Sequence, residues 1–200
     1  YEKTFKVEPG DYLRAQFGMV NGAVFGGFWS PLEPVAGVDS ADCVGFGLTV
    51  EGNGVQPDKA YLTLKTESGA AYISKNLRDI FADTQWTDVI VKAEDVQVDP
   101  AYVKTNPQQA ATLPAKPDFT KITRFDLSCV GSLQNAEAIL QVKQFFVAVK
   151  QPAGAADQAA KLQTVLDFTK KKTLPVYGNA QTGPQKPGTI YTVAVCPTDP

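Results

Sequence analysis

Apolar and polar residues alternate one by one through much of this 200-residue chain. In residues 13–17, 46–50 and 60–64 every second side chain is apolar, which is the period of a β-strand with one face in a core. Turn signals rich in Gly, Pro, Asn and Asp separate such runs: Pro9-Gly10-Asp11, Asn21-Gly22, Gly52-Asn53-Gly54 and Val98-Asp99-Pro100. Roughly eight short strands in the first 150 residues predict an antiparallel β-sandwich of the jelly-roll kind.

The alternation also predicts which side chains form the core. In the long run Ile139 to Val149, residues Ile139, Phe145, Val147 and Val149 are expected on one face, whereas Pro100 to Pro117 is typical of a long loop. The glycines of Gly45-Phe46-Gly47 are expected to let a strand pass a bulky neighbour. The expected core residues are Phe17, Phe46, Leu48, Leu62, Leu64, Val89, Val91, Phe125, Phe145 and Val147.

The composition changes after Lys150, which divides the chain into a sandwich domain over residues 1–150 and an extension over 151–200. Within the extension an apolar stripe predicts an amphipathic helix at about residues 155–172. A Pro- and Gly-rich arm follows, with Leu174, Val176, Tyr177 and Tyr191 as candidate partner-binding anchors. The alternative is that Thr189 to Cys196 returns to the sandwich as an edge strand.

The chain contains no histidine, which excludes Ser-His-Asp and Cys-His triads and a histidine general base. We expect no catalytic residue, no cofactor and no metal site. A carboxylate-pair glycosidase would have to use surface acids such as Glu51 and Glu94. Asp39 and Asp42 are a weak calcium signal because they lack the spacing of a calcium loop.

Charge and cysteine usage limit the partners and the compartment. The 19 basic and 21 acidic residues leave a net charge of -2, which does not favour nucleic acid. Cys43, Cys129 and Cys196 are widely spaced and odd in number, so a reducing compartment is expected, such as the plastid stroma or the mitochondrial matrix. No apolar run approaches the ~20 residues that span a bilayer. The start at Tyr1 fits either a processed mature protein or a truncated one.

One ordered set of residues resembles a known protein family. It comprises Gly26-Gly27-Phe28, Asp39-Ser40, Gly45-Phe46-Gly47-Leu48, Gly52-Asn53-Gly54, Tyr61-Leu62, Tyr72 and Trp86. This order is similar to the domain of the complex I intermediate-associated protein family, a galactose-binding-like jelly roll. The resemblance covers about residues 20–130 and departs from the family after Val91, where Lys92-Ala93-Glu94-Asp95-Val96 replaces its Pro and Phe.

The resemblance implies a non-catalytic structural or assembly protein that binds protein subunits of a bioenergetic complex. That complex could be respiratory, a photosystem or a phycobilisome antenna in photosynthesis. The fold relatives of the family imply the alternative, a carbohydrate-binding module. Both functions need exposed aromatic side chains, for which Trp29, Tyr72 and Trp86 are the candidates, although Trp86 is expected mainly as a core or strand anchor.

Overall fold

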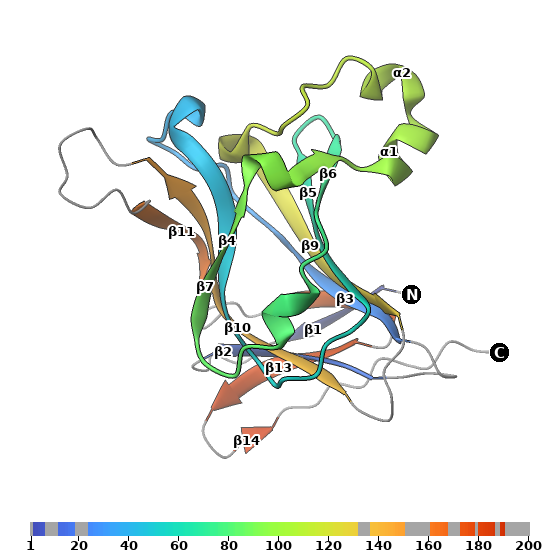
Figure 1. Cartoon of the computed structure of the whole chain (residues 1–200), viewed down its shortest axis with the longest axis vertical. Helices are drawn as coiled ribbons and strands as arrows, with labels where there is room; N and C mark the ends of the chain where they lie inside the picture. Colours follow the sequence, from blue (N-terminus) through green and yellow to red (C-terminus); the bar gives the residue numbers. More distant parts are fainter. Residues whose placement is uncertain are drawn as a thin grey trace.

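The computed structural model describes residues 2–6, 12–18, 24–131, 137–150, 161–167, 173–178, 180–186 and 189–190. These residues form two antiparallel sheets packed face to face as a sandwich, as the alternation predicts. In Figure 1, β4, β7 and β10 stand on one side of the molecule, and β3, β5 and β9 stand on the other. The core lies between them.

Sheet A has the strand order β1-β12-β3-β9-β5-β6-β8. Its strands are β1 (Glu2–Lys6), β12 (Thr173–Gly178), β3 (Val24–Pro31), β9 (Ile122–Gly131), β5 (Lys59–Thr66), β6 (Ala71–Ser74) and β8 (Val96–Val98). Sheet B has the order β14-β13-β2-β10-β4-β7, with β11 paired to β10. Its strands are β14 (Thr189–Ile190), β13 (Ala180–Lys186), β2 (Tyr12–Phe17), β10 (Ala138–Val149), β4 (Cys43–Gly52), β7 (Thr87–Lys92) and β11 (Lys161–Asp167).

Short helices occupy the connections between strands. They are η1 (Ser40–Asp42), η2 (Arg78–Phe81), η3 (Ala93–Asp95), α1 (Pro100–Thr105), α2 (Pro107–Ala110) and η4 (Phe119–Lys121). The expected loop of residues 100–117 therefore contains two helical turns, which lie beyond one end of the sandwich (Figure 1). Asp99 caps α1 by accepting a hydrogen bond from the Ala101 N–H at 2.8 Å, and Pro100 occupies the first helical position.

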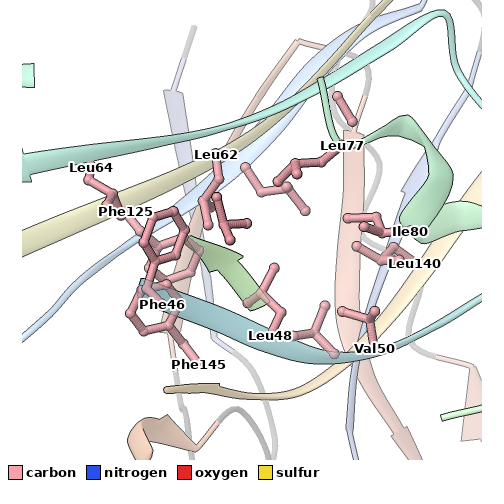
Figure 2. Close-up of a cluster of buried hydrophobic side chains, with 14 of the residues drawn as sticks. Phe46, Leu48, Val50, Leu62, Leu64, Leu77, Ile80, Phe125, Leu140 and Phe145 are labelled. Atoms are coloured by element: carbon pink, nitrogen blue, oxygen red, sulfur yellow. The ribbon is translucent and has the colours of Figure 1, made fainter. Parts of the chain in front are cut away.

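The core joins both sheets through one cluster of buried apolar side chains. Figure 2 shows Phe46, Leu48 and Val50 of β4 opposite Leu62 and Leu64 of β5. The Phe125 and Phe145 rings stack with centroids 5.2 Å apart, which ties β9 to β10 across the sandwich. Of the ten expected core residues, nine are buried and Val89 is half-buried, because its strand is the outermost of sheet B.

The expected face of β10 is wrong for Ile139. Leu140 and Val142 are buried in its place, and the buried positions become Phe145 and Val147 further along the strand. The register against β4 shifts between Val142 and Gln144, so one extra residue on β10 reverses the phase of the alternation. A strict period of 2 cannot follow a bulge.

The expected helix at residues 155–172 is wrong over its central part. Residues 161–167 form β11, which pairs with the second half of β10, while β2 pairs with the first half along the same edge. Residues 155–160 and 168–172 lie outside the described residues. The apolar stripe wrongly predicted a helix, because helix propensity alone does not stabilise an isolated amphipathic segment. The open edge of β10 instead provides backbone hydrogen-bonding partners along the segment, which favours a strand.

The arm returns to the sandwich along its described backbone. β12 lies between β1 and β3, β13 pairs with β2, and β14 pairs with the other edge of β13. The alternative of an added edge strand is thus confirmed for Thr189–Ile190, while residues 191–196 lie outside the described residues. Both sheets therefore contain strands from before Lys150 in the sequence and strands from after it.

Candidate binding site

Tyr72 does not meet the expectation of an exposed aromatic anchor. Its side chain is 2% exposed and belongs to the core, and its hydroxyl donates a hydrogen bond to the Pro114 carbonyl at 3.1 Å. Burial, together with the nearby Tyr102, raises the pKa of the phenol. Tyr72 therefore holds the segment after α2 against β6 and offers little surface to a partner.

Trp29 is half-buried on the outer side of sheet A. Its neighbour Phe28 points into the core, so the two adjacent side chains do face opposite ways, as the sequence predicts. The Arg124 guanidinium carbon lies 3.8 Å from the Trp29 ring centroid, and two 2.9 Å hydrogen bonds join Arg124 to Asp126. Because this ion pair covers one face of the ring, Trp29 is a packed surface residue and not an open platform.

The other expected anchors lie in the arm. Leu174, Val176 and Tyr177 are on β12, and their backbones pair with β1 and β3. Tyr191 lies outside the described residues. Their role as side-chain anchors stays a prediction.

Trp86, expected as a core or strand anchor, lies instead on the outer side of sheet B. Its ring is half-buried and tilted against Tyr12 at a centroid distance of 5.5 Å, and the Lys143 ammonium lies 3.9 Å from the ring centroid. Tyr12 points outward because the next residue, Leu13, is buried. The Lys143 ammonium covers one face of this ring, as Arg124 covers one face of Trp29, and Tyr12 packs against it, so the two contacts fix Trp86 as a half-buried tryptophan of the outer surface.

The bulge in β10 builds this site. Lys143 and Gln144 are consecutive, and both are partly exposed, whereas a regular strand would send one of them into the core. An extra residue re-aims a side chain in this way, which is why bulges occur beside functional sites. The bulge that made the period-2 prediction wrong for β10 thus places Lys143 against the Trp86 ring and Gln144 on the outer face.

A row of polar side chains crosses four strands next to Trp86. The Thr164 hydroxyl donates to Gln144 Oε1 at 2.8 Å, Gln144 Nε2 donates to the Thr49 hydroxyl at 3.0 Å, and that hydroxyl donates to Asp88 Oδ1 at 2.5 Å. The strands in order are β11, β10, β4 and β7. We call the outer side of sheet B that carries these four residues with Tyr12, Trp86 and Lys143 the Trp86 face.

A second polar group borders the Trp86 face on β2. The Arg14 guanidinium donates to Gln16, and Gln16 donates to the Glu137 carboxylate. Burial lowers the pKa of Arg14, and the Glu137 and Tyr12 charges oppose that shift. The face therefore combines a flat aromatic ring with hydrogen-bonding groups of both kinds held in fixed positions, an arrangement suited to recognising a surface or a planar ligand.

Asp39, one of the two residues of the weak calcium signal, has a structural role. The Asp39 carboxylate accepts the Ala41 N–H at 2.9 Å and caps η1. No group of three or more Cys, Asp or Glu side chains among the described residues is arranged to hold a metal ion. Cys43 and Cys129 are free thiols, and burial raises the pKa of both, with nearby aspartates, Asp118 first, adding to the shift at Cys43.

Comparison of the chain with protein families, curated proteins and solved structures found no match. The resemblance to the complex I intermediate-associated protein family accordingly stays a prediction. In the described part of the chain, no helix has the length and apolar character needed to cross a membrane.

Proposed function

We propose that this protein is a non-catalytic structural or assembly domain that binds protein subunits of a larger bioenergetic complex through the Trp86 face. The observation that supports the proposal most is a tryptophan kept on the surface by Tyr12 and Lys143. Rigid aromatics carry a large share of the energy of protein interfaces, and a side chain already held in place loses little entropy on binding. The resemblance at residues 20–130 supports a jelly-roll, galactose-binding-like topology and a respiratory, photosystem or phycobilisome partner.

Free thiols support a reducing compartment such as the plastid stroma or the mitochondrial matrix. Cys129 is fully buried in the core and Cys43 is half-buried. Both thiols are free within the described part of the chain, and the third cysteine, Cys196, lies outside it.

The test is co-purification of the tagged full chain with its complex from the source organism, the complex being identified by its pigments or subunits. Trp86→Ala should lower the affinity of the chain for the purified complex by roughly 30-fold, because a hot-spot residue contributes about 2 kcal/mol or more to the binding free energy. Tyr61→Ala is the matched control, since Tyr61 is a half-buried aromatic on a different sheet. Unchanged urea midpoints would show that both variants fold. Binding that survives Trp86→Ala and is lost with Tyr61→Ala would refute the assignment of the face.

The polar row favours a second candidate, a carbohydrate-binding module. Aromatic rings stack on sugar rings, and the hydroxyls at the edge of a sugar can donate hydrogen bonds to a carboxylate such as Asp88 and accept them from an amide such as Gln144. Titration of the chain with soluble polysaccharides, followed by tryptophan fluorescence and calorimetry, tests this candidate. Saturable binding that Gln144→Ala and Trp86→Ala both abolish would support it, and no heat with any polysaccharide would exclude it.

A further inference from the structure

The strand β7 forms one border of sheet B, and its outer edge is not paired within the described part of the chain. It is bonded to β4 on one side only, over Val50↔Thr87 to Gly45↔Lys92. The residues before and after it, 82–86 and 93–98, are described and lead away into η2, η3 and β8. An open edge of this length is a template for another strand.

The side chains of β7 make this edge self-complementary. Ile90 is 38% exposed, and Asp88 and Lys92 flank it at equal spacing with opposite charge. When two copies of β7 run antiparallel about a two-fold axis through Ile90, Ile90 meets Ile90 of the second copy. Each Asp88 then lies opposite a Lys92, and each Val89 lies opposite a Val91.

Alternative pairings of two β7 edges lack this agreement. A parallel pair in register places Asp88 against Asp88 and Lys92 against Lys92. An antiparallel pair shifted by two residues places Ile90 against a charged side chain. Like charges directly opposite one another disfavour the parallel pair, and only the antiparallel register centred on Ile90 sets apolar against apolar side chains and opposite charges against each other.

We propose that a second copy of this chain pairs with β7 in that register, so that the two copies of sheet B become one continuous antiparallel sheet. The pairing covers the exposed part of Ile90 and the half-buried Val89, which sits at the rim of the core. It also sets two Trp86 faces on one surface, which gives a partner with repeated subunits two points of attachment. The pairing itself is independent of the nature of that partner.

The test is sedimentation equilibrium of the full chain over a wide range of concentrations, with single and double charge reversals. The wild-type chain should show a monomer–dimer equilibrium. Asp88→Lys alone and Lys92→Asp alone each replace two favourable cross-strand pairs with two unfavourable ones, so each should raise the dimer dissociation constant roughly tenfold. The double variant Asp88→Lys with Lys92→Asp should restore dimerisation.

Two further measurements separate the charge effect from other causes. The Thr49 hydrogen bond is lost with Asp88→Lys in both the single and the double variant, so only the cross-strand charges explain a rescue. An equimolar mixture of the two single variants should form a heterodimer, because all its charge pairs are again opposite. Lys104→Asp, an exposed reversal on α1, is the control and should have no effect. A chain that stays monomeric, or a dimer insensitive to both single reversals, would overturn the proposal.

Discussion

Gly47→Ala tests the packing of the outer side of sheet B more sharply than any other single change. Gly47 pairs with Phe146 on β10 and with Ile90 on β7. A Cβ added there would lie 2.1 Å from the Val89 carbonyl oxygen and 2.7 Å from the Phe146 Cζ atom. The obstacle is therefore partly backbone, and the Phe146 ring is fully buried and cannot turn into solvent.

We expect Gly47→Ala to lower the free energy of unfolding by about 3 kcal/mol, the upper end of the range for overpacking, because β4 and β7 must separate to admit the methyl group. Urea unfolding followed by tryptophan fluorescence measures the change at constant m. Gly18→Ala is the matched control, since the nearest atom to its added Cβ is Glu137 Oε1 at an ordinary 3.7 Å. We expect it to change stability by less than about 1 kcal/mol.

A double variant identifies the obstacle. Phe146→Leu removes part of the ring but leaves the Val89 carbonyl in place, so Gly47→Ala with Phe146→Leu should cost less than the sum of the single changes without reaching full rescue. A loss below about 0.5 kcal/mol for Gly47→Ala, or equal losses at Gly47 and Gly18, would refute this account of why glycine occupies β4.

Four other outcomes follow from burial, pairing and pKa. Leu48→Ala should cost about 2–5 kcal/mol and Val89→Ala clearly less, because Leu48 is 3% exposed and Val89 lies at the rim; equal urea-derived losses would contradict this. Deleting residues 173–200 should sharply lower the urea midpoint, since β12 lies between β1 and β3, and an unchanged midpoint would restore the arm as a separate binding element. Burial raises the pKa of Asp118, but the hydrogen bonds from Thr120 and the nearby Lys121 together lower it in the folded state, so its stabilisation is present at neutral pH and lost as the pH falls below about 4. Asp118→Ala should flatten that part of the measured profile of stability against pH. Thiol reagents at pH 8 should label Cys43 before Cys129 in the folded protein, as peptide mapping would show, because Cys129 is fully buried.

The sequence by itself determined the class of fold and most of the core. The apolar residues that alternate along β2, β4 and β5 fall on one face only if the chain is a pleated strand. Phe17, Leu48 and Leu62 were therefore assigned correctly to the core without any knowledge of their neighbours. Adjacent Phe28 and Trp29 had to face opposite ways for the same reason. Local periodicity carries this information because it depends on the chain alone.

Tertiary structure decided everything that depends on a partner strand. The bulge at Lys143 has no local sequence signal, because it arises from the match of β10 to β4, and it moved Ile139 out of the core and built the Trp86 face. The stripe at residues 161–167 is compatible with a helix until the free edge of β10 is known, and then the edge provides the backbone partners that make it a strand. Tyr72 was expected at the surface and is buried, whereas Trp86 was expected mainly in the core and lies at the surface. Whether an aromatic side chain is covered depends on residues far away in sequence, which are Pro114 for Tyr72 and Tyr12 with Lys143 for Trp86.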